Sequence, residues 1–95
     1  MEDNKVILTF RKDLSNLAGY DFGLSVFNEQ VKDKVNIRED FEIIFPIHIT
    51  GIASSFVQGF FSEIVGEIGL MKTEEHAKIR ASSDALANAI IEKLE

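Results

Sequence analysis

The chain has no cysteine and no tryptophan, only one proline, and fewer basic than acidic residues. The absence of cysteine excludes disulfides, thiolate metal ligands and a cysteine nucleophile. Ten basic residues against sixteen acidic ones give a formal charge of −6, and no cluster of lysine and arginine offers the footprint that nucleic acid requires. No apolar run approaches the roughly 20 residues that cross a bilayer. We therefore expect neither nucleic acid nor a membrane as a partner.

What the chain does have is enough apolar material for a core. Of its 95 residues, 45% are hydrophobic and eight are phenylalanine. This length predicts a single domain over residues 1–95, with a core from about residue 5 to residue 94. The start, Met1–Asn4, is acidic and polar, unlike a signal peptide. The cytoplasm is the expected location.

Hydrophobic periodicity predicts strands and helices in alternation. Helix 20–35 is expected to be capped by Asp21. Expected strands and helices follow the order 5–10 (strand), 20–35 (helix), 41–45 (strand), 54–68 (helix), 76–81 (strand) and 84–94 (helix, capped by Ser82 or Ser83). A βαβαβα order predicts a small α/β domain with a mostly parallel, three- to four-stranded sheet and helices mainly on one face. The first or the third strand is then an exposed edge.

The second strand and its surroundings carry further expectations. The near-continuous apolarity of Phe41–Phe45 predicts burial on both faces of the sheet. Pro46 ends this strand because it lacks an N–H group. Residues 47–51 are expected to form a connection whose isoleucines reach the core. Gly69 is the expected stop of the following helix, and residues 70–75 are expected to form a loop.

The helix between residues 54 and 68 is unusually apolar. Glu63 and Glu67 define a narrow polar face toward solvent. Because the rest of the helix is largely apolar, we expect a core helix packed on the sheet. Phe56 is expected to be its most exposed apolar residue. The apolar stripe comprises Phe56, Val57, Phe60, Phe61, Ile64, Val65 and Ile68.

Two adjacent serines, Ser54 and Ser55, stand at the predicted start of this helix. A helix start has N–H groups without partners and favours negative charge. A hydroxyl there can cap the helix, contact an anion or carry a phosphate. The residue types favour capping by one of the two serines, a contribution of about 1 kcal/mol.

The pattern Gly51-Ile52-Ala53-Ser54-Ser55-Phe56, placed after a hydrophobic strand and before an apolar helix, resembles a bacterial STAS-like family of unknown function. That family is distantly similar to anti-sigma factor antagonists, whose second serine in this place is phosphorylated by a histidine-kinase-like ATPase. The resemblance implies a regulatory interaction module and places the phosphorylation role on Ser55. Ala53 and Phe56 depart from the antagonist pattern, which has an acidic residue and a glycine there.

The sequence offers no enzyme signature. His48 and His76 are the only imidazoles, and they are far apart without metal-ligand spacing. We expect no cofactor, no metal and no catalytic residue. The expected docking surface for a regulatory protein comprises Thr50, Gly51, Ser54, Ser55 and Phe56. Two alternatives remain open: a small anion or nucleotide bound at the same helix start, and a homodimer formed through an edge strand.

Overall fold

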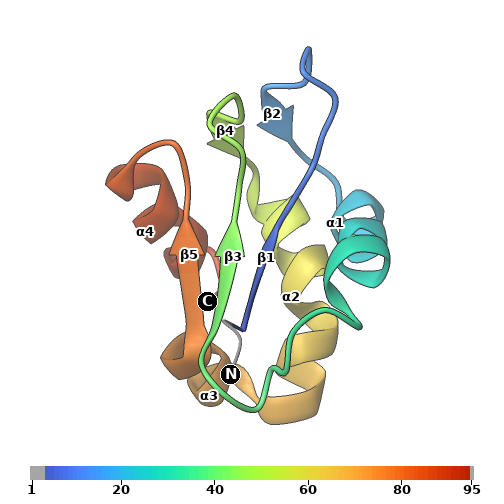
Figure 1. Cartoon of the computed structure of the whole chain (residues 1–95), viewed down its shortest axis with the longest axis vertical. Coiled ribbons are helices and arrows are strands. Elements are labelled where there is room, and N and C mark those ends of the chain that lie inside the picture. Colours follow the sequence, from blue (N-terminus) through green and yellow to red (C-terminus); the bar gives the residue numbers. More distant parts are fainter. Residues whose placement is uncertain (1–3, 95) are drawn as a thin grey trace.

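The structure, a computed structural model, describes residues 4–94. Met1–Asp3, part of the acidic segment used in the signal-peptide argument, lies outside the described residues. Strands and helices alternate along the chain (Figure 1) in the order β1 (Lys5–Ile7), β2 (Asn16–Leu17), α1 (Tyr20–Val26), η1 (Phe27–Val31), β3 (Phe41–Ile44), β4 (Gly51–Ile52), α2 (Ser54–Ile68), α3 (Leu70–His76), β5 (Ala77–Arg80) and α4 (Asp84–Glu92).

The main sheet has the order β1-β3-β5, and both pairings are parallel. Val6, Ile43 and Ile79 lie side by side in its middle row. The expected small α/β domain with a parallel sheet is therefore confirmed. β1 is shorter than expected because the N–H group of Thr9 turns away to the side chain of Gln30, 2.8 Å from its Oε1. A second parallel pair, β2 with β4, was not expected at all.

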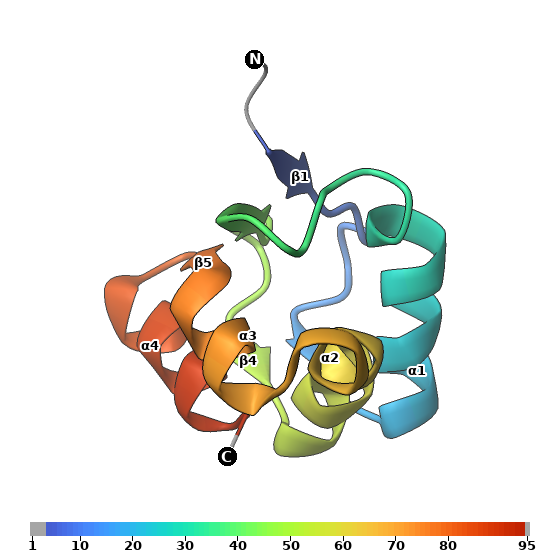
Figure 2. The same cartoon turned by 90° about the horizontal axis from the view of Figure 1, so that it is seen from below.

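Only one face of the main sheet is covered by helices. Figure 2 shows α1, α2 and α4 on the same side of the strands, as expected for so few strands joined by right-handed crossovers. Residues of β3 alternate accordingly: Phe41 and Ile43 are buried, while Glu42 and Ile44 are partly exposed. The expectation that this strand is buried on both faces is wrong. The helices that follow β3 within residues 4–94 pack on the same face as α1.

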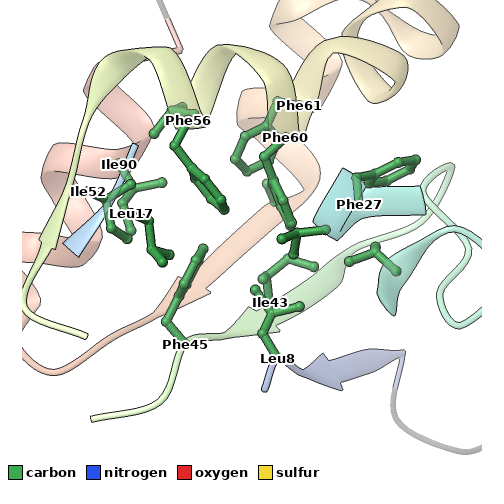
Figure 3. Packing of buried hydrophobic residues seen from close by; sticks show 14 of the residues in the cluster. Leu8, Leu17, Phe27, Ile43, Phe45, Ile52, Phe56, Phe60, Phe61 and Ile90 are labelled. Carbon is green, nitrogen blue, oxygen red and sulfur yellow. The ribbon is translucent and has the colours of Figure 1, made fainter. Parts of the chain in front are cut away.

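The core lies between this covered face and α2. Phe56 and Phe60 point from α2 toward Phe45 and Ile43 (Figure 3). The ring of Phe60 is central, because its centroid lies 5.0 to 6.1 Å from those of Phe61, Phe56, Phe27 and Phe45. The predicted core role of α2 is confirmed, with Glu63 and Glu67 exposed.

The first helix differs from expectation at both ends. Its N-cap residue is Gly19, with φ 104°, and Asp21 lies inside the first turn rather than capping it. The helix becomes a π-helical turn at η1, where Lys32 N–H binds the carbonyl of Phe27 at 3.0 Å. It ends at Val31, four residues early.

The segment after α2 is helical, although a loop was expected. Gly69, with φ 88°, ends α2 as expected, and α3 then begins at Leu70. Thr73 is fully buried and its hydroxyl donates to the carbonyl of Gly69 at 2.8 Å. The inward residue of this helix is thus a threonine, so no apolar stripe marks it. Ile47 also departs from expectation, being 84% exposed, whereas Ile49 is buried.

The last helix follows expectation closely. Ser83 is its N-cap residue and accepts a hydrogen bond from Leu86 N–H at 3.1 Å. Asp84 lies in the first turn, where a negative charge is favourable. Ile90 and Leu94 are buried in the core.

Candidate functional site

The chain leading into α2 is held firmly by the segment that contains β2. Thr50 N–H and Gly51 N–H both donate to the carbonyl of Ser15, at 2.8 and 3.2 Å. Ala53 N–H donates to the carbonyl of Leu17 at 2.8 Å. Backbone hydrogen bonds to the β2 segment therefore hold the start of α2 in place.

These hydrogen bonds also decide which residue caps α2. Ala53 is the N-cap residue, with φ −78° and ψ 155°, and no side chain of residues 4–94 caps the helix. The first backbone bond of the helix runs from Val57 N–H to the carbonyl of Ala53, at 3.2 Å. Ser54 and Ser55 are thus the first two helical residues, and the expectation that one of them is the cap is wrong. The hydrogen bond from Ala53 N–H to Leu17, which follows the pairing of β4 with β2, fixes the boundary one residue earlier.

Ser55 has a different structural task. Its Oγ accepts a hydrogen bond from Gly19 N–H at 2.9 Å. Gly19 is the N-cap residue of α1, so Ser55 links the starts of the two helices. No local sequence pattern predicts this link, since the two residues lie 36 positions apart.

Two glycines allow α1 and α2 to approach closely next to this link. A Cβ at Gly59 would fall on the backbone of Tyr20, 2.7 Å from its carbonyl carbon. A Cβ at Gly23 would fall on the backbone of Phe56 and lie 2.7 Å from the nitrogen of Phe60. The two helix backbones are in direct contact, and the position of Ser55 relative to Gly19 is fixed by that contact.

Phe56 does not belong to the surface, contrary to expectation. It is 0% exposed, and its ring contacts those of Phe22 and Phe60, with centroids 5.6 and 5.8 Å away. It faces inward because it is the third residue of a helix whose apolar stripe begins there. The remaining expected residues are accessible: Thr50, Ser54 and Ser55 are exposed, and Gly51 is half-buried.

The histidines do not meet. His76, at the end of α3, donates from Nδ1 to Asp40 Oδ1 at 2.9 Å, and this hydrogen bond holds the pKa of Asp40 below its ordinary value. His48, in the connection after β3, lies with Nε2 3.0 Å from the carbonyl of Arg11. The two imidazoles are near opposite ends of β3. Within residues 4–94 no group of His, Asp and Glu side chains is arranged to hold a metal ion.

A groove that sequence reasoning missed lies between the segment after β1 and the α1–η1 helix. Its volume is about 420 Å³. Apolar residues form its floor, and Glu29 and Gln30 of η1 stand at its rim. The helical pattern places Phe22 among the buried residues, whereas in the structure it is 39% exposed and lines the groove.

None of the helices within residues 4–94 has the length and apolarity to span a bilayer. Searches with protein-family models, among curated proteins and among solved structures give no match to this chain.

Proposed function

We propose that this chain is a non-catalytic STAS-like interaction module that docks to a regulatory protein. The docking surface, named here the α2-start surface, comprises Thr50, Gly51, Ser54 and Ser55. The observation that carries the proposal is that two neighbouring hydroxyls are exposed on a fixed base without being needed to cap the helix. Neither hydroxyl caps α2, although the oxygen of Ser55 accepts a hydrogen bond from Gly19 N–H. Exposed hydroxyls on a fixed surface of this kind are suited to recognition.

Negative charge at Ser55 is the proposed control of docking. A kinase-type ATPase partner transfers the γ-phosphoryl group of ATP to Ser55 Oγ, ADP leaves, and the hydroxyl proton passes to a base of the kinase. The N–H groups of residues 54–56 precede the first backbone bond of α2, so an added charge of about −1.5 to −2 is favourable there. The helix survives the modification while the charge and shape of the surface change.

The buried position of Phe56 supports this proposal. A glycine stands there in the antagonist pattern, and an exposed phenylalanine would block a kinase approaching Ser55. Because Phe56 is fully buried, it leaves access to the Ser55 hydroxyl open. The alanine at position 53 still removes a carboxylate from the surface, so the proposed partner does not rely on an acidic contact there.

The test compares partner affinity among matched variants. The protein is purified from its native host, its intact mass is measured for added phosphate, and the co-purifying partner is titrated against four forms: wild type, Ser55→Asp, Ser55→Ala and Ser82→Asp. Ser82 is an exposed serine just before the cap of α4, so Ser82→Asp adds the same charge beside a different helix start. We expect Ser55→Asp to weaken binding by about tenfold or more and Ser82→Asp to leave it unchanged. Wild-type affinity in folded Ser55→Asp and Ser55→Ala variants refutes the proposal.

Binding of a small anion or nucleotide at the same helix start gives a different result. It predicts that phosphate or ATP raises the melting temperature without any protein partner, whereas docking alone does not.

A homodimer through an edge strand is the second candidate, and one observation favours it. β1 is an edge of the main sheet, and Ile7 on it is 63% exposed. Sedimentation of the purified chain over a range of concentrations decides this point, because a monomer at high concentration excludes the dimer.

A further inference from the structure

The groove beside α1 has the dimensions and the floor of a small-molecule site. Its volume of about 420 Å³ falls within the range of ligand pockets, which are mostly apolar with a few polar groups at the rim. The floor is formed by Phe10, Leu14, Phe22 and Val26. We name it the Phe10–Phe22 groove.

Phe22 makes the floor both firm and accessible. Its ring packs edge-on against Phe56 of the core, with centroids 5.6 Å apart, and against Phe10, with centroids 6.2 Å apart. It nevertheless remains 39% exposed. An aromatic ring that is fixed by its packing contacts and still partly exposed to solvent is suited to stack with a flat or branched apolar group.

The π-helical turn η1 builds the rim. Glu29 and Gln30 both lie in it, and such turns occur frequently at functional sites. The Gln30 side chain accepts from Thr9 N–H at 2.8 Å and donates to the Thr9 carbonyl at 3.0 Å. Gln30 therefore holds the opposite wall of the groove in place and leaves ligand contact to its neighbour.

The groove lining carries one charge of each sign, and Glu29 is the one without an ion pair among residues 4–94. Arg11 also lines the groove, but its guanidinium is paired with Asp13, with Nε 3.0 Å from Oδ1. The Glu29 carboxylate accepts a hydrogen bond from Ser25 Oγ at 3.2 Å, and among the ion pairs of residues 4–94 it has no cationic partner. A carboxylate beside an apolar floor favours a ligand that brings its own positive charge.

We propose that the Phe10–Phe22 groove binds a small molecule that combines an aromatic or branched apolar group with a protonated amine. The apolar group occupies the floor beside Phe22, and the ammonium group donates hydrogen bonds to Glu29. This site is separate from the α2-start surface, and it does not depend on docking there.

The test uses phenethylamine as the probe and hydrocinnamate, its anionic counterpart of similar size, as the control. Each is titrated into the folded chain and followed by two-dimensional amide NMR. We expect saturable shifts of the amides of Phe22, Ser25 and Glu29 with phenethylamine, at a Kd at or below about 1 mM, the affinity expected for a ligand of this size. Hydrocinnamate should give no saturable shift. Equal binding of both probes, or no saturable shift with phenethylamine, overturns the proposal.

Three variants locate the binding. Glu29→Gln removes the rim charge but keeps an acceptor for Ser25, and should weaken phenethylamine binding roughly fivefold. Glu92→Gln makes the same change on the exposed side of α4 and should bind as wild type. Ser25→Leu extends an apolar side chain into the groove and should abolish binding. Unchanged affinity in the folded Glu29→Gln variant refutes the assigned role of the carboxylate, and with it the proposal.

Discussion

Replacing Gly59 with alanine tests the contact between α1 and α2 that positions Ser55. An added Cβ would overlap the carbonyl oxygen of Tyr20 and lie 2.7 Å from its carbonyl carbon and 3.0 Å from its Cα. These atoms are backbone and cannot rotate away, so the two helices must separate. Gly66 is the matched control on the same helix, because a Cβ built there has no heavy atom within 4 Å among residues 4–94, apart from its chain neighbours and the backbone of its own helix.

The two substitutions are expected to change the free energy of unfolding in opposite directions. Alanine in place of glycine within a helix contributes about 1 kcal/mol of stability, and Gly66→Ala should show nearly all of it. Overpacking against a fixed neighbour costs about 1–3 kcal/mol, and a backbone neighbour places Gly59→Ala near the upper end. Subtracting the helix gain leaves a loss of about 2 kcal/mol for Gly59→Ala. The two variants should therefore differ by about 3 kcal/mol, a large part of the roughly 5–10 kcal/mol of a domain this size.

Urea unfolding followed by circular dichroism measures this difference, provided that both variants share the wild-type m value. Thermal unfolding should agree, with the melting temperature of Gly59→Ala lowered by about 10 °C and that of Gly66→Ala raised by about 4 °C. A Gly59→Ala variant as stable as Gly66→Ala would show that the helices are not in backbone contact, and the fixed link between Ser55 and Gly19 would lose its basis.

Three further outcomes follow from the structure. Ser83→Ala removes the cap of α4 and should lower the free energy of unfolding in urea by about 1 kcal/mol. Ser54→Ala removes no cap and should change it by less than about 0.5 kcal/mol. Equal losses in the two variants would contradict the capping assignment. Phe60→Ala empties the centre of the ring cluster and should cost about 3–5 kcal/mol, so a cooperative thermal transition close to that of wild type would count against the described core. The hydrogen bond from His76 lowers the pKa of Asp40 below 3.8. This pair therefore stabilises the folded state above about pH 4, and its contribution disappears as the pH falls through the lowered pKa. Carboxyl NMR titration should give an Asp40 midpoint below 3.8 that rises in His76→Ala, and an unchanged midpoint would refute the pairing.

The periodic segments of the sequence were predicted well because their signals are local. α2 and α4 carry apolar residues at helical spacing, and Ser83 followed by Asp84 marks a helix start. The alternation of strands and helices was sufficient to predict a parallel sheet. Local patterns failed where the deciding interaction came from elsewhere in the chain. α3 was missed because its buried residue is Thr73, whose hydroxyl bonds to Gly69.

The candidate site shows the same division. Two serines after a glycine and before a phenylalanine were enough to locate a helix start, and the structure places α2 there. Their roles followed from tertiary contacts. The pairing of β4 with β2 makes Ala53 the cap, and Gly19 N–H donates a hydrogen bond to the hydroxyl oxygen of Ser55. The Phe10–Phe22 groove joins segments that a single-sequence pattern does not connect.

By itself, then, the sequence determined a small α/β fold, a helix start at two serines, a core helix rich in phenylalanine and a net negative charge, since each depends on composition or on residues close together in the chain. The tertiary structure alone decided which residue caps α2, that Phe56 is buried, that one face of the sheet is left without helices and that Glu29 stands beside an apolar groove. These features depend on backbone hydrogen bonds and close helix contacts between residues far apart in sequence, and such pairings leave no periodic trace for a pattern to detect.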